Sequence, residues 1–160
     1  MAVIRLPLES EGDKIISIAQ DAGVFNNAEI ETVKEVWKEY LKNEEIEYAY
    51  HFLVIGEKDQ IHGFACYGQR PLTQGTFDLY WIVINSDQRR KGFGKAILQR
   101  VEQDVLTKGG RLLIIETSGS VEYDPTRAFY LSSGYQLEAK ICDFYHPRDD
   151  LMIFTKHLVN

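Results

Sequence analysis

The sequence has few cysteines and no group of residues with the spacing of a metal site. Its 160 residues include two cysteines, Cys66 and Cys142, each in an apolar stretch typical of a strand. There is no CxxC pair, and Cys142 with His146 alone offers too few ligands for zinc. We therefore expect two reduced, largely buried thiols and no bound metal.

The sequence also lacks long apolar runs and an excess of positive charge. No run approaches the roughly 20 residues of a membrane span, and the first residues, MAVIRLPLESEGDK, lack the apolar core of a signal peptide. The 18 basic residues are outnumbered by 24 acidic ones, which gives a formal net charge of -6. The first two absences predict a cytoplasmic protein. Because a negative protein repels phosphates, we also expect no binding to nucleic acid or membrane, and the negative charge favours cationic partners.

Length and hydrophobic pattern predict a single domain over residues 1–160. Hydrophobic residues make up 44% of the chain, enough at this length for a core without disulfides or metals. Periodicity predicts the order β, α, α, β, β, β, α, β, α, β, β, which indicates a mixed α/β or α+β fold. The predicted strands are 3–6, 48–56, 61–67, 76–84, 111–117, 135–145 and 151–157, and the predicted helices begin near 10–13, 26–27, 92 and 126.

The loop that joins the strand at 76–84 to the next helix carries the clearest functional pattern. It reads Asp-Gln-Arg-Arg-Lys-Gly-Phe-Gly-Lys over residues 87–95. Its glycines let backbone approach a ligand, and the first N–H groups of a helix form an anion site with the helix dipole. The pattern predicts a pyrophosphate site, although a solvated basic loop that caps a helix would have the same sequence pattern. Arg89, Ala96 and Ile97 exclude a P-loop and a dinucleotide fingerprint.

At these residues the sequence resembles the GCN5-related N-acetyltransferase (GNAT) family. The family signature Arg/Gln-x-x-Gly-x-Gly/Ala is matched by RRKGFG at 89–94, and a second signature, an aromatic–Tyr pair followed by Gly–aromatic, is matched by FYLSSGY at 129–135. The resemblance implies a central twisted sheet of about six to seven strands with about four flanking helices. It also implies transfer of acetyl from acetyl-CoA to a primary amine, by direct attack in a ternary complex.

The resemblance assigns roles to individual residues. The hydroxyl of Tyr130 would protonate the departing thiolate, although a core aromatic would fit the same position. Asp78 and Glu116 are the two candidate general bases. The alternative for Asp78 is a polar residue on the exposed face of its strand, and for Glu116 a charge at a strand end. A chain of waters could replace a dedicated base. Tyr123 stands where many relatives have an Asn that contacts the coenzyme. Thr126 and Arg127 could replace this contact, although Arg127 would fit equally as a surface charge. Acetyl-CoA would be held by Ile82, Val83, Ile84, Arg89, Arg90, Lys91, Gly92, Phe93, Gly94 and Lys95.

The acceptor is the least constrained part of the prediction. The segment 143–150 is expected to be a loop beside the acceptor pocket, where Asp143 and Tyr145 could hold a cationic amine by charge and cation–π contact; a solvated hairpin turn is the alternative. A small-molecule amine is the preferred acceptor. The alternatives are a protein or peptide amine, or an acyl-CoA-binding module without turnover, and a homodimer is possible in each case.

Overall fold

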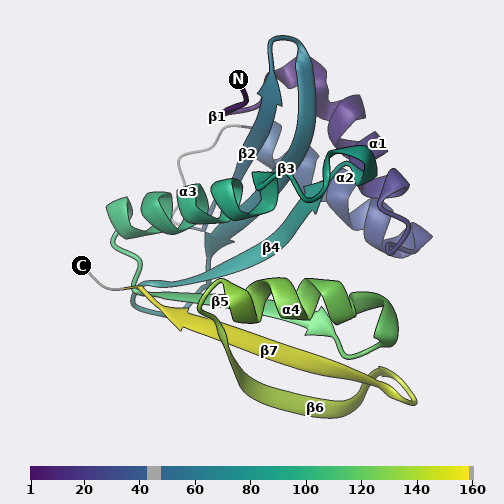
Figure 1. The fold of residues 1–160 in the computed structure, drawn as a ribbon. Helices are drawn as coiled ribbons and strands as arrows, with labels where there is room; N and C mark the ends of the chain where they lie inside the picture. Colours follow the sequence, from purple (N-terminus) through teal and green to yellow (C-terminus); the bar gives the residue numbers. More distant parts are fainter. Residues whose placement is uncertain (43–47, 159–160) are drawn as a thin grey trace.

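The computed structural model describes residues 1–42 and 48–158, which form one sheet with helices on both faces (Figure 1). The sheet has seven strands in the order β1-β2-β3-β4-β5-β7-β6. This confirms the mixed α/β fold expected from the sequence. The strands are β1 Val3–Arg5, β2 Tyr50–Glu57, β3 Gln60–Gln69, β4 Thr76–Ile84, β5 Leu112–Ser118, β6 Gln136–His146 and β7 Asp149–His157, and the helices are α1 Gly12–Asp21, α2 Asn27–Leu41, α3 Phe93–Thr107 and α4 Asp124–Ser132.

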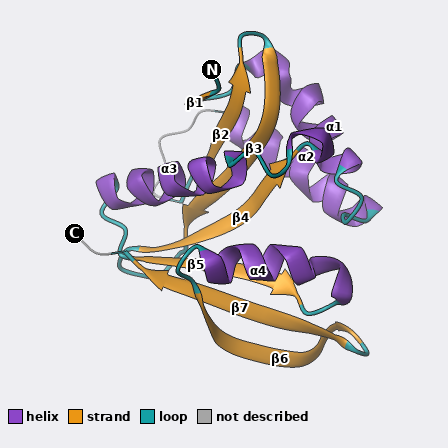
Figure 2. Cartoon of the chain, viewed as in Figure 1, coloured by secondary structure: helices purple, strands orange, loops and turns teal. Residues whose placement is uncertain are grey.

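The helices form two layers (Figure 2). On one face α1 and α2 bury Ile15 and Val33 against Phe52 and Phe64 of the sheet. On the other face α3 and α4 cover a second core, whose buried members include Ile97, Val101, Leu113, Ile115, Tyr130 and Phe154.

Local hydrogen bonds fix the start of α2 where the sequence predicts it. At the start of α2, Asn26 Oδ1 accepts from the Glu29 N–H at 2.8 Å, and the Glu29 carboxylate accepts from the Asn26 N–H at 3.2 Å.

The parallel pair β4–β5 comes apart halfway along. Pairing runs from Thr76↔Leu112 to Leu79↔Ile115 and then stops, although both strands continue. Tyr80 is an extra residue in β4, because Cys66 pairs with Trp81 while the next β3 residue pairs with Leu79. Such a bulge bends its strand and increases the local twist. We call the diverging ends, 80–84 of β4 and 116–118 of β5, the splay, and Figure 1 shows the two strands separating there.

The last hairpin corrects two expectations. Every residue of β6 is exposed, and β6 is an edge strand that pairs on one side only, with β7. Cys142 is therefore an exposed free thiol, not a buried one, whereas Cys66 is buried as expected. Segment 143–150 is also not an open loop: β6 reaches His146 and β7 begins at Asp149, with a tight turn between them.

None of the helices in the described part of the chain has the length and apolar character that crossing a lipid bilayer requires.

Candidate functional site

The loop before α3 presents unpaired backbone amides at the surface. Arg90 has φ +64° and Gly92, the N-cap, has φ +82°. Gly92 has no side chain to cap the helix, so the first N–H groups of α3 receive no side-chain acceptor. Among the described residues, the N–H groups of Phe93, Gly94 and Lys95 donate to no protein oxygen. Unpaired amides at a helix start, together with the helix dipole, suit an anion.

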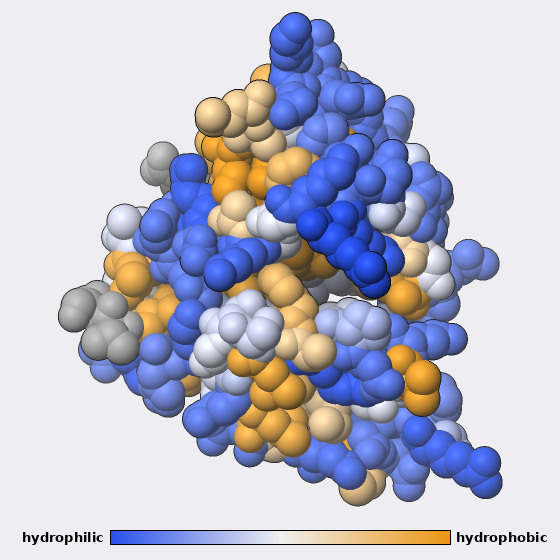
Figure 3. All heavy atoms as spheres, viewed as in Figure 1, coloured by the Kyte–Doolittle hydropathy of each residue, from blue (hydrophilic) through white to orange (hydrophobic). Residues whose placement is uncertain are grey.

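Positive side chains surround these amides. Arg89, Arg90, Lys91 and Lys95 are all exposed, and the hydrophilic surface over this loop is visible in Figure 3. Lys91 Nζ donates to Gln88 Oε1 at 2.9 Å, and within the described chain no ion pair joins the other three to a carboxylate. The predicted residues 89–95 are thus gathered at one place with their charge available to an anion.

The start of α3 lies against both sides of the splay. A Cβ built on Gly94 would be 3.5 Å from the ring of Phe129 on α4 and 3.9 Å from the side chain of Ile84 on β4. On its other edge β4 pairs with β3, through Ala65↔Ile82 and Phe64↔Val83. Within residues 1–42 and 48–158, the β5-facing edge of residues 82–84 has no strand partner, because pairing with β5 ends at Leu79. Backbone groups at this edge are free to bond an extended ligand.

Tyr130 projects from α4 into the core on the same face as α3. Its ring packs near Tyr135 and Phe154, with centroid distances of 5.9 and 6.3 Å, and only 5% of the residue is exposed. Burial raises the pKa of its hydroxyl well above the ordinary value. The hydroxyl is therefore protonated at neutral pH, the state that a proton donor requires.

The two predicted carboxylates differ in their surroundings. Asp78 is buried and accepts two hydrogen bonds from Arg70, from Nε at 2.7 Å and from Nη2 at 2.6 Å. The pair raises the pKa of the Arg70 guanidinium further above its ordinary value. Glu116 is exposed and lies 3.4 Å from Arg70 Nη2. Arg70 was missed from the sequence because no motif marks it; it lies just beyond β3, eight residues from Asp78.

On the α2 side of the splay, acidic groups gather round Tyr145. Tyr145 is 46% exposed, and the burial of the rest of the residue raises the pKa of its hydroxyl. The negative charges of Glu116, Asp149 and Glu29 raise this pKa further. Tyr123 lies in the same environment, with a pKa raised to about 12 by burial and then by Glu29. These residues come from α2, β5, β6, β7 and the turn before α4. Their proximity depends on tertiary structure and could not be predicted from sequence spacing.

Asp143 has a role within the hairpin. Its Oδ1 accepts from the Arg148 N–H at 2.7 Å, and its own N–H donates to Asp150 Oδ1 at 2.9 Å. Asp149 is better placed to face the splay, since it accepts a hydrogen bond from Ser118 Oγ on β5 and lies 3.3 Å from His146 Nε2. The carboxylates whose charges act on the Tyr145 hydroxyl are thus Glu116, Asp149 and Glu29, and Asp143, which was predicted with Tyr145, is not among them.

Arg127, a substitute considered for the coenzyme contact, holds the chain between β5 and α4. Its Nη1 donates to the carbonyl oxygens of Ser118 at 2.6 Å and Ser120 at 2.9 Å, and its Nη2 pairs with Asp124. These bonds fix the entry to α4, which carries Tyr130. Arg127 thus positions the helix, and Thr126 beside it is partly buried.

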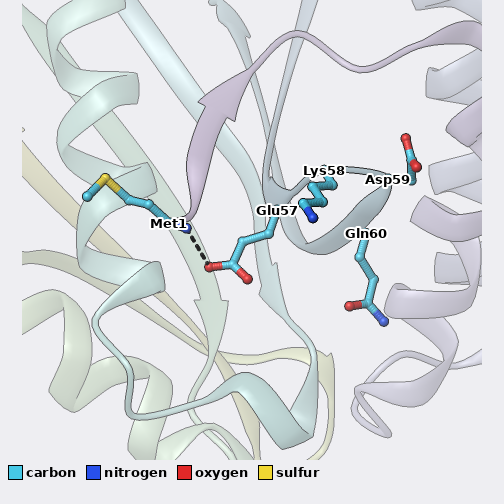
Figure 4. Close-up of a pocket in the computed structure, with 5 residues that line it drawn as sticks. All are labelled: Met1, Glu57, Lys58, Asp59 and Gln60. Atoms are coloured by element: carbon cyan, nitrogen blue, oxygen red, sulfur yellow. Dashed lines mark ion pairs between the residues drawn. The ribbon is translucent and has the colours of Figure 1, made fainter.

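A hollow of about 530 Å³ beside the β2–β3 turn lies apart from these groups (Figure 4). It is lined by Met1 and residues 57–60, and the Met1 amino group pairs with Glu57 at 3.2 Å. None of the residues assigned to a site from the sequence lines it, so the splay is the better candidate.

Three comparisons with known proteins bear on this site. The profile of the acetyltransferase (GNAT) family matches residues 16–135. A comparison with curated proteins gave no match. Among solved structures, an acetyltransferase of the GNAT family from Desulfovibrio desulfuricans has a TM-score of 0.95 and 36% identity, over 99% of this chain and 100% of the other.

More distant structures share the fold. The ribosomal-protein-S18-alanine N-acetyltransferase of Escherichia coli has a TM-score of 0.76 at 19% identity, over 100% of this chain and 96% of the other. The acetyltransferase yncA of Salmonella typhimurium, solved with its cofactor acetyl-CoA, has a TM-score of 0.78 at 14% identity, over 100% and 95%. With the family profile covering most of the sequence and a close structural relative over its whole length, the chain belongs to the GNAT family of acetyltransferases and is an acyltransferase.

Proposed function

We propose that the protein transfers the acetyl group of acetyl-CoA to a primary amine of a small cationic molecule, by direct attack within a ternary complex. The observation that carries the proposal is the arrangement of the α3 start. Its unpaired amides and basic neighbours lie next to the open edge of β4, and Phe129 packs against it one residue before Tyr130.

Acetyl-CoA fits this arrangement. Its diphosphate would accept hydrogen bonds from the N–H groups of residues 93–95. The positive charges nearby would attract it; they belong to Arg89, Arg90, Lys91 and Lys95. Its pantetheine arm, which contains amide groups, would pair with the free backbone edge of Ile82, Val83 and Ile84. This edge would also donate to the thioester carbonyl as negative charge develops there.

Tyr130 would donate a proton to the thiolate as it leaves. The burial of its side chain keeps the hydroxyl neutral, because a low-dielectric surrounding disfavours the phenolate. A group that stays protonated through the physiological range suits a general acid.

Glu116 is our preferred base of the two predicted carboxylates. An amine acceptor must lose a proton before attack, since a free amine of the lysine type has a pKa of about 10.4. Glu116 is exposed on the α2 side of the splay, whereas both oxygens of Asp78 accept from Arg70. A bidentate pair with a guanidinium leaves a carboxylate poorly placed to take a proton.

The acceptor would approach from the α2 side. Glu116, Asp149 and Glu29 place negative charge around Tyr145 there. Carboxylates attract an ammonium group, and a tyrosine ring adds cation–π contact. This surrounding favours a small amine with a second positive charge over a neutral one.

A thiol-release assay with purified protein and acetyl-CoA tests the proposal. The acceptor panel contains diamines, neutral primary amines, amino acids, and peptides with a free N-terminus or a lysine. We expect the highest kcat/KM for a small dicationic amine. Turnover confined to peptides would contradict the acceptor, and absence of both turnover and calorimetric acetyl-CoA binding would contradict the function. The homodimer that the sequence leaves possible stays a prediction, and sedimentation of the same preparation tests it.

A further inference from the structure

Thr117 on β5 carries a buried hydroxyl without a protein partner. The residue is 6% exposed, and Oγ1 is the one buried side-chain nitrogen or oxygen among the described residues that has no hydrogen-bond partner. Buried polar groups are nearly always satisfied, because an unmade hydrogen bond costs free energy. An exception in a native fold calls for a physical reason.

The position of Thr117 relates this hydroxyl to the splay. Thr117 follows Leu113 and Ile115 along one face of β5, and both of these residues belong to the core that contains Tyr130. Pairing with β4 ends at Ile115, one step before Thr117 on that face. On its other edge β5 pairs normally, with Thr117 opposite Met152 of β7. The hydroxyl therefore lies on the α4 side of β5, where the strand has lost its neighbour β4.

Neighbouring polar side chains of β5 are satisfied in other ways. Glu116 and Ser118 alternate to the opposite face, where Glu116 meets Arg70 and Ser118 Oγ donates to Asp149. Among these three consecutive polar residues, the one on the Tyr130 face is thus the one left without a protein partner.

We propose that the hydroxyl of Thr117 binds the coenzyme. Rotation about its Cα–Cβ bond brings Oγ1 into the space between β4 and β5, where it forms a hydrogen bond with an amide group of the pantetheine arm. This inference rests on the proposed function, because it needs coenzyme A in the splay. Thr117 is then a positioning residue: it holds the arm, and Tyr130 remains the proton donor.

Two substitutions separate this role from a structural one. Thr117→Val keeps the shape of the side chain and removes the hydroxyl, whereas Thr117→Ser keeps the hydroxyl. Isothermal titration with coenzyme A gives Kd, and thermal unfolding without ligand gives Tm. We expect Thr117→Val to raise Kd about tenfold, the worth of one hydrogen bond, with Tm equal to or above that of the wild type. Thr117→Ser should bind within about twofold of the wild type.

The outcomes are distinguishable. If the wild type binds coenzyme A and Thr117→Val binds equally well, the inference is wrong and the proposed function stands. A lower Tm for Thr117→Val, or its failure to fold, would also overturn the inference, because the unliganded fold would then need the hydroxyl. If the wild type itself does not bind coenzyme A, the proposed function fails and the inference fails with it.

Discussion

Arg70 holds Asp78 through two hydrogen bonds that run side by side, while its Nη2 lies 3.4 Å from Glu116. One guanidinium therefore meets both carboxylates that the sequence offers as general bases, and it treats them differently. Asp78 is buried and fully engaged, and Glu116 is exposed and loosely held. The difference predicts opposite consequences for two matched substitutions.

Replacing Asp78 by Asn should act on stability. We expect the free energy of unfolding to fall by about 1–3 kcal/mol, because the buried amide satisfies Arg70 less well than a carboxylate does. Glu116→Gln should lower kcat about a hundredfold, as expected when a general base is lost, and should change stability by less than about 0.5 kcal/mol since its side chain is exposed. Urea unfolding and steady-state kinetics measure both; full activity in Glu116→Gln would remove it as the base.

Tyr130→Phe should separate chemistry from binding. We expect kcat to fall by about 10²–10⁴, with Kd for coenzyme A within about twofold of the wild type. The control is Tyr135→Phe, which removes another buried hydroxyl on the same face, one that donates to Glu102 at 2.9 Å. The control should lose stability and keep kcat. Equal losses of kcat in the two variants would show that Tyr130 acts through packing.

The pH dependence of kcat follows from the same tyrosine. Burial raises the pKa of Tyr130 above its ordinary value of about 10. The donating form is therefore present at all pH values below 10 and is lost only at higher pH. We expect a pH–rate profile with no basic limb below about pH 10 from this group. A basic limb near pH 8 that disappears in Tyr130→Phe would contradict the assignment.

Two glycines with nearly the same φ angle test the anion site. Gly92 precedes α3 at φ +82° and Gly109 follows it at φ +80°, and a Cβ at either position would meet nothing within 4 Å. Alanine should thus cost about 1–2 kcal/mol of stability at each, from the left-handed conformation alone. Gly92→Ala alone should weaken coenzyme A binding, by about tenfold, because it disturbs the amides that face the diphosphate. Calorimetry that shows equal affinities would refute the site.

Glu11 provides a pH test of the fold that is independent of catalysis. Its carboxylate accepts from Arg5 at 2.7 and 2.9 Å and from the Leu8 N–H at 2.8 Å, and the Arg5 hydrogen bonds lower its pKa. A lowered pKa stabilises the fold above the unfolded value of about 4.3, and this stabilisation is lost as the pH falls through the folded value.

We expect Glu11→Gln to be less stable than the wild type by about 1–3 kcal/mol at pH 7, and the difference to shrink below about pH 4. Glu9→Gln is the control, since Glu9 is exposed and lies only two residues before Glu11 in the same short helix. Urea unfolding at several pH values measures both. A difference that stays constant down to pH 3 would show that the ionised pair contributes nothing.

The fold could be predicted from the sequence where the signals are local. The capping pair Asn26 and Glu29 and the periodic apolar faces mark elements within a few residues of their observed ends. The bulge at Tyr80 was hidden, because apolar residues continue through β4 on both sides of it. The exposure of Cys142 was also hidden, since a strand's place at the edge of a sheet depends on pairing and not on its own residues.

The same distinction applies to the site. Residues 89–95 are contiguous, so the loop and the helix start keep them together whatever the rest of the fold, and their role as a pyrophosphate site stays a prediction. Arg70 with Asp78, and Tyr145 with Glu29, are brought together by strand order and by helix packing. In the sequence, Thr117 has only the features of an ordinary strand residue. That its hydroxyl has no partner among the described residues follows from the surroundings of the side chain in the structure.

The splay has a mechanical consequence. In the described chain, four residue pairs of β4 and β5 form the whole ladder between β1–β4 on one side and the β5–β7–β6 unit on the other. So short a ladder means that side-chain packing also has to join the two halves of the sheet, and the core beneath α3 and α4 contains residues of both. A coenzyme that touches α3 and α4 together would add contacts across this junction, and amide exchange should slow on both halves at once.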